Sequence, residues 1–98
     1  MTDIYGQCPC LFQTRSSVLL CAHRDIRPGR SGVGLSYSID EGRTWKWGGS
    51  LYQAPDPSNR DCAYPSMTYL DTGEILCVYY TAFEGGQSDI EGVVLVEV

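Results

Sequence analysis

Apolar segments along this chain are short, rich in Val, Ile, Leu and Tyr, and bounded by Gly, Pro, Asp or Ser. No segment keeps an i, i+3, i+4, i+7 apolar pattern over the roughly ten residues that a helix requires. Short apolar runs between turn residues are typical of β-strands. The pattern therefore predicts an all-β protein with strands over 10–14, 18–23, 34–38, 45–52, 66–70, 74–80 and 90–98.

The two halves of the chain repeat one another at a shift of 56 residues. Pro9 falls on Pro65, Cys21 falls on Cys77, and the turn at 15–17 falls on the turn at 71–73. Each copy combines a Pro-led strand, a tight turn, a buried second strand, a longer loop and a third strand. Antiparallel meanders of this kind are the blades of β-propellers. We predict one blade over about 8–55 and a second over about 61–98.

The most specific motif in the chain is S-x-D-x-G-x-T-W at 38–45, between two predicted strands. An Asp carboxylate in a tight turn can accept hydrogen bonds from backbone N–H groups, and a Gly permits a positive φ. The motif resembles the Asp-box, or BNR repeat, of sialidases (neuraminidases) and related β-propellers. In that family the Asp-box lies away from the active site, which implies a structural role for Ser38, Asp40, Gly42, Thr44 and Trp45.

Two further stretches extend the resemblance to most of the chain, roughly 8–98. Residues 61–66 and 71–80 resemble the C-terminal blades of sialidases, where a Tyr precedes a strand, a turn and an apolar strand. Residues 19–24 and 30–36 resemble the segment that carries the third arginine of the sialidase triad. The resemblance implies two antiparallel blades of a six-bladed sialidase-like β-propeller, as a fragment or as a self-assembling unit.

The resemblance also assigns candidate site residues. Tyr64 falls where sialidases have their tyrosine nucleophile, and a neutral phenol avoids repulsion by the carboxylate of sialic acid. The alternative for Tyr64 is an aromatic side chain packed at a strand end. Arg30 is the better match for the arginine that binds the sugar carboxylate, and Arg24 competes for that role. Asp61 either reaches the pocket or, as we favour, caps a turn.

Several members of the sialidase constellation have no counterpart here: the general acid Asp, the Glu that activates the tyrosine, and the other two arginines. The resemblance thus implies a sialidase-like glycoside hydrolase fragment, from a family that hydrolyses terminal sialic acid from glycans, and this chain alone is expected to be inactive. The alternative is a non-catalytic carbohydrate-binding or scaffold module. The expected partners are an acidic glycan and either the remaining blades or two further copies that close a ring as a trimer.

Composition narrows the function classes further. The net charge of -5 argues against nucleic-acid binding. Five cysteines without a C-x-x-C pair, together with a single histidine, do not match a metal site, and we expect no metal or organic cofactor. No apolar run approaches the roughly 18 residues of a membrane span. The first residues do not resemble a signal peptide, which leaves the compartment open and favours the cytoplasm.

Overall fold

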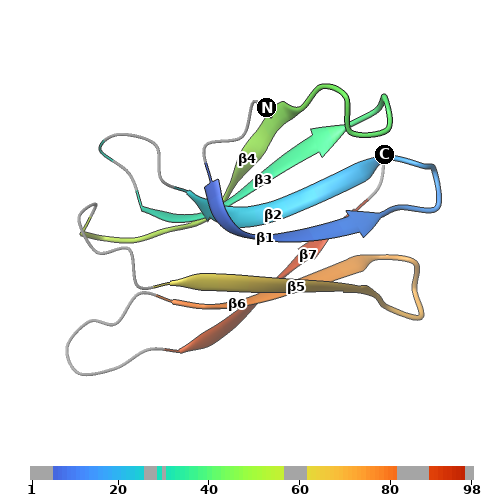
Figure 1. Ribbon diagram of the computed structural model, residues 1–98. Helices are drawn as coiled ribbons and strands as arrows, with labels where there is room; N and C mark the ends of the chain where they lie inside the picture. Colours follow the sequence, from blue (N-terminus) through green and yellow to red (C-terminus); the bar gives the residue numbers. More distant parts are fainter. Residues whose placement is uncertain (1–5, 26–28, 30, 57–61, 82–88, 97–98) are drawn as a thin grey trace.

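The computed structural model describes residues 6–25, 29, 31–56, 62–81 and 89–96, and these residues form two antiparallel sheets (Figure 1). The first sheet has the order β1-β2-β3-β4, with β1 at Gly6–Gln13, β2 at Leu19–Asp25, β3 at Gly32–Ser38 and β4 at Lys46–Gln53. The second has the order β5-β6-β7, with β5 at Ala63–Tyr69, β6 at Ile75–Tyr80 and β7 at Ile90–Leu95. The prediction of an all-β chain is confirmed, and the described part contains no helix able to span a membrane.

Two strands begin three or more residues earlier than their apolar pattern predicts. β1 begins at Gly6 instead of residue 10, and β5 begins at Ala63 instead of residue 66. In each case the pairing continues through a bulge, between Gln7 and Cys10 in β1 and between Ala63 and Ser66 in β5. Both bulges contain a proline, which has no N–H to donate to the ladder and is tolerated at such a position. Each proline therefore interrupts a strand without starting it.

The sequence repeat is also a repeat of structure. Strands β5 and β6 occupy the positions of β1 and β2 shifted by 56 residues, and the bulge of β5 lies 56 residues after the bulge of β1. The first hairpin is closed by the N–H of Thr14, which donates to the Val18 carbonyl at 2.8 Å. The same bond recurs between Leu70 and Glu74, also at 2.8 Å. The two copies thus share one hairpin geometry.

The hydrophobic core lies between the two sheets, where one face of each is buried against the other. The fully buried core residues are Ala22 and Val33 from the first sheet and Ala63, Cys77 and Tyr79 from the second, and larger half-buried side chains pack around them. Strands β1 and β5 lie next to one another across this interface (Figure 1). Chemistry-bearing side chains from the two sheets can therefore meet where β2 ends and β5 begins.

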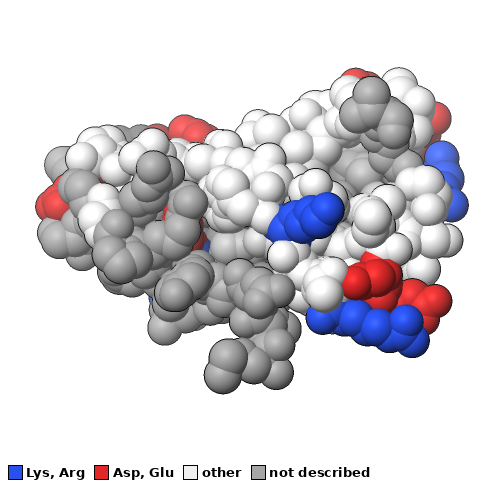
Figure 2. Space-filling model, turned by 90° about the horizontal axis from the view of Figure 1, so that it is seen from above, with Lys and Arg blue, Asp and Glu red and all other residues white. Residues whose placement is uncertain are grey.

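The two ends of the molecule differ in what they carry. Strands β1, β3 and β5 finish at one end of the molecule, where tight turns follow them, and strands β2, β4 and β6 finish at the other (Figure 1). At the end with the tight turns, acidic and basic side chains lie next to one another (Figure 2). At the opposite end β2 finishes with Asp25 paired to Gly32, and β5 starts with Ala63 paired to Tyr80.

Candidate functional site

The motif at 38–45 forms a turn whose polar groups bond to one another. The Asp40 carboxylate accepts hydrogen bonds from the hydroxyl and the N–H of Thr44, the latter at 2.9 Å, and from the Ser38 hydroxyl at 2.7 Å. These donors, the Thr44 hydroxyl first, hold the pKa of Asp40 well below its usual 3.8. Trp45 closes the turn, since its indole N–H donates to the Gly42 carbonyl at 3.0 Å. The motif residues are thus occupied in holding the turn together.

The backbone at the start of β5, at the opposite end, has an unusual conformation. Ala63 and Tyr64 have φ values of 96° and 45°, although neither is a glycine. A left-handed conformation costs an L-residue about 1–2 kcal/mol. The bulge and these angles turn Tyr64 outward, so that it is 65% exposed while Ala63 and Pro65 on either side are buried. Backbone strain of this kind persists where the surroundings impose it, and it is frequent at functional sites.

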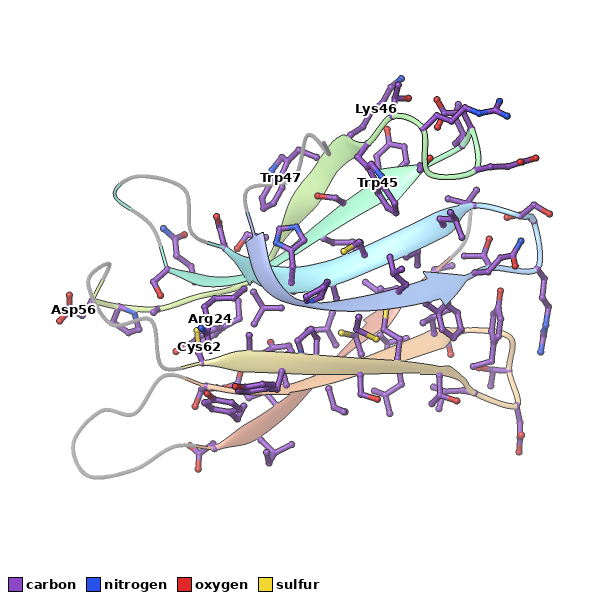
Figure 3. The ribbon with its side chains drawn as sticks, in the orientation of Figure 1. Arg24, Trp45, Lys46, Trp47, Asp56 and Cys62 are labelled. Carbon is purple, nitrogen blue, oxygen red and sulfur yellow. The ribbon has the colours of Figure 1, made fainter. Side chains whose placement is uncertain are left out.

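Tyr64 lies beside Arg24, which comes from the other sheet. The Arg24 Cζ atom is 5.8 Å from the centroid of the Tyr64 ring. The Arg24 Nε–H donates to the Cys62 carbonyl at 3.0 Å, which fixes the guanidinium at the start of β5. Figure 3 shows Arg24 next to Cys62, at the end of the molecule away from Trp45. Two of the predicted site residues, Arg24 and Tyr64, are therefore brought together.

The remaining predicted site residues are not placed in this way. Arg30 and Asp61 lie outside the described residues. Ser38 ends β3 at the other end of the molecule, and the turn that follows it contains Asp40, Gly42, Thr44 and Trp45. The described part of the candidate site is accordingly the pair Arg24 and Tyr64 with the groups that hold them.

Tyr80 is a member of the site that the sequence analysis did not select. Its ring stacks on the ring of Tyr64, with the centroids 5.7 Å apart and the planes inclined by 20°. The repeat contains the signal that could have found it, since Tyr80 follows Arg24 by 56 positions. In the pairing, Gln7 lies opposite Arg24 and Ala63 lies opposite Tyr80, so both residues lie across from the start of a bulge.

A histidine and a serine form a hydrogen-bonded pair inside the first sheet. His23 Nδ1 is 3.2 Å from the Arg24 carbonyl, and Nε2 is 3.0 Å from the Ser36 hydroxyl. A carbonyl only accepts, so in the neutral imidazole Nδ1 carries the proton and Nε2 accepts from Ser36. His23 and Ser36 are only 1% and 4% exposed, and the centroids of the His23 and Trp47 rings are 6.1 Å apart. The pair is therefore closed to substrate and stabilises β2 next to Arg24.

The buried cysteines Cys21 and Cys77 do not add a reactive centre. Burial raises the pKa of Cys21, and it raises the pKa of Cys77 to about 11. Thiols with a raised pKa are poor nucleophiles and poor metal ligands at neutral pH. Among the described residues, no group of three or more His, Cys, Asp or Glu side chains is arranged to hold a metal ion.

Comparison with known proteins gives no relative for this chain. No family model matches the sequence, no curated protein is significantly similar to it, and no solved structure matches the fold. The likeness to sialidases therefore rests on the motif at 38–45, on the repeat and on the residues named above. The activity and the ligand follow as proposals.

Proposed function

We propose that this chain contributes two blades to a sialidase-like β-propeller, and that Arg24 and Tyr64 form part of its site for a carboxylated sugar. The observation that carries the proposal is the meeting of an arginine from one sheet with an exposed, strained tyrosine from the next. A guanidinium binds a carboxylate through two parallel hydrogen bonds. A phenol beside it can contact the sugar ring or its hydroxyl groups. Sialic acid, a sugar with a carboxylate, has the chemistry that this pair would recognise.

The arrangement of the sheets supports the propeller part of the proposal. Two meanders related by a 56-residue repeat pack face to face, with their first strands β1 and β5 adjacent. The Asp-box turn and the Arg24–Tyr64 pair lie at opposite ends of the strands. Sialidases, as the resemblance implies, separate their Asp-boxes from their active site in the same way. Further blades would cover the exposed apolar residues of β7, which include Ile90 and Val94.

The proposed role is binding, with Tyr64 at the position of the family's nucleophile. A tyrosine nucleophile requires a base to remove its proton and a general acid to protonate the leaving group. The carboxylates that do this in sialidases have no counterpart in the sequence. We therefore expect this chain by itself to bind a sialic acid without hydrolysing it.

The proposal is tested by titrating the ¹⁵N-labelled chain with N-acetylneuraminic acid and following its amide resonances. We expect shifts confined to the residues around Arg24 and Tyr64. Arg24→Ala removes a charge-assisted contact and should weaken binding about tenfold to a hundredfold. Arg24→Lys keeps the positive charge, loses the two parallel hydrogen bonds of a guanidinium, and should give an intermediate affinity.

Arg15 offers a matched control at the other end of the molecule. Its Cζ lies 4.1 Å from the Tyr69 ring centroid, so Arg15→Ala removes a similar Arg–Tyr contact away from the proposed site. The Arg15→Ala variant should bind the sugar with the same affinity as the parent chain. The methyl ester of the sugar, which lacks the negative charge, should bind to the parent as weakly as the acid binds to Arg24→Ala. Equal affinity of the parent and Arg24→Ala for the acid would overturn the proposal, and so would a parent that does not bind.

A further inference from the structure

We infer that Tyr80 is a positioning residue, which holds the ring of Tyr64 in its outward orientation beside Arg24. The inference rests on the proposed function in so far as this orientation serves sugar binding. Its structural content, the dependence of Tyr64 on Tyr80, can be tested separately. Nothing in the sequence pattern or in the sialidase resemblance assigns a role to Tyr80.

Tyr80 connects the exposed Tyr64 to the buried part of the molecule. It is half-buried and packs against the small cluster formed by Ala54 and Cys62, while Tyr64 is 65% exposed. The two rings are nearly parallel, at 20°, with 5.7 Å between their centroids. A tyrosine exposed to this degree would otherwise sample several side-chain rotamers, and a stacking partner favours one of them. Tyr80 is thus the anchored partner and Tyr64 the oriented one.

Tyr80 also contacts the site through its backbone. Tyr80 pairs with Ala63, directly before the bulge that contains Tyr64. Ala63 and Tyr64 both have positive φ, so the local backbone alone disfavours the observed orientation. The stack between the rings offsets part of that strain. Arg24, in contrast, is held by its hydrogen bond to the Cys62 carbonyl, a contact in which the Tyr64 ring takes no part.

This separation predicts a specific pattern in two variants of the full chain, Tyr80→Leu and Tyr80→Phe. Tyr80→Leu removes the ring, and Tyr80→Phe keeps the ring and removes only the hydroxyl. We expect Tyr80→Leu to weaken binding of N-acetylneuraminic acid about two- to tenfold, and Tyr80→Phe to bind like the parent. Phe12→Leu is the matched control, because Phe12 packs on Tyr69 with 5.2 Å between ring centroids at the other end. It should leave the affinity unchanged.

The spectroscopic readout uses tyrosines labelled in the ring. In the parent, the protons of Tyr64 should show NOEs to the ring of Tyr80 and a ring-current shift. Tyr80→Leu should move the Tyr64 resonances toward those of a free tyrosine, and Tyr80→Phe should preserve them. Unchanged Tyr64 resonances in Tyr80→Leu would overturn the inference, as would their loss in Tyr80→Phe.

The two proposals fail in distinguishable ways. A parent that shows the inter-ring NOEs and does not bind the sugar contradicts the proposed function and supports the positioning role. A parent that binds the sugar and lacks these NOEs contradicts the positioning role alone. Should Tyr80→Leu not fold, the NOEs of the parent and the resonances of Tyr80→Phe still decide the inference.

Discussion

The two copies of the repeat share a backbone and differ in what they place at the site. Each begins with a bulge that contains a proline, closes the same hairpin, and continues into a strand with a buried cysteine, Cys21 or Cys77. At the end of that strand the first copy has Arg24 and the second has Tyr80. One copy therefore supplies a cation and the other an aromatic ring to the same place. The repeat thus specifies the scaffold, while single side chains at the strand ends specify the chemistry.

The copies also differ in what covers the equivalent face of their second strand. Side chains alternate along a strand, so Ile75, Cys77 and Tyr79 share one face of β6, and this face packs against the first sheet. The equivalent face of β2 carries Leu19, Cys21 and His23. Ala22, on the opposite face of β2, packs in the core between the sheets, so the face with Cys21 points away from the second sheet. Equivalent positions thus have different surroundings.

Truncating the equivalent side chains Ile75 and Leu19 should have the largest effect on stability, and an unequal one. Ile75 is 1% exposed, and Leu19 at the equivalent position is half-buried. Ile75→Ala should lower the free energy of unfolding by about 2–5 kcal/mol, because it removes buried methylenes and leaves a cavity. Leu19→Ala should cost about half as much or less, since solvent already reaches the side chain. Urea unfolding followed by circular dichroism measures both, and equal losses would show that the two side chains contribute equally to the packing.

Much of the fold could be predicted from residue pattern, and its exceptions have local causes. The strands follow from short apolar runs between turn residues. The starts of β1 and β5 were predicted late because Pro9 and Pro65 resemble strand boundaries, whereas the pairing passes them through bulges. A bulge depends on the register of two strands, which the pattern of one strand does not contain.

The candidate site was only partly predictable. Arg24 and Tyr64 were named through a family resemblance, and Arg30 and Asp61 stay predictions. Tyr80 was missed because a tyrosine at the end of an apolar strand has no local signal. Its relation to Tyr64 arises from stacking across strands and from the positive φ of Tyr64, both of which depend on tertiary structure.

A smaller effect is expected from Asp40, whose turn lies in the first sheet and should make the stability of the protein depend on acidic pH. Its hydrogen bonds lower the folded-state pKa of Asp40 below the 3.8 of an unperturbed Asp. The carboxylate therefore contributes its full stabilisation above about pH 5, and this is lost as the pH falls through 3.8 toward the folded-state pKa. Asp40→Asn, which cannot titrate, should lower the melting temperature at neutral pH and flatten its dependence between about pH 5 and pH 2. Parallel pH profiles for parent and variant would contradict this assignment.

The smallest effect tests the shared hairpin, by exchanging the residues that take the same conformation in the two copies. Ser17 and Gly73 lie 56 positions apart, with φ values of 68° and 89°. Each N–H donates back to the residue three positions before it, to Thr14 at 3.0 Å and to Leu70 at 2.9 Å. The turn thus requires a positive φ in both copies, which a serine adopts at a cost and a glycine adopts freely.

Ser17→Gly should raise the free energy of unfolding by about 0.5–1 kcal/mol, the left-handed strain removed less the backbone entropy that a glycine loses on folding. Gly73→Ser should lower it by a similar amount. Its Cβ would meet nothing nearer than the Arg15 guanidinium at 3.8 Å, so the loss comes from φ and not from a clash. The double exchange should return to within about 0.5 kcal/mol of the parent, since the two effects have opposite signs and one cause. A destabilised Ser17→Gly would mean that the serine side chain stabilises the first hairpin by more than its backbone strain costs, and the two turns would then be equivalent in shape only.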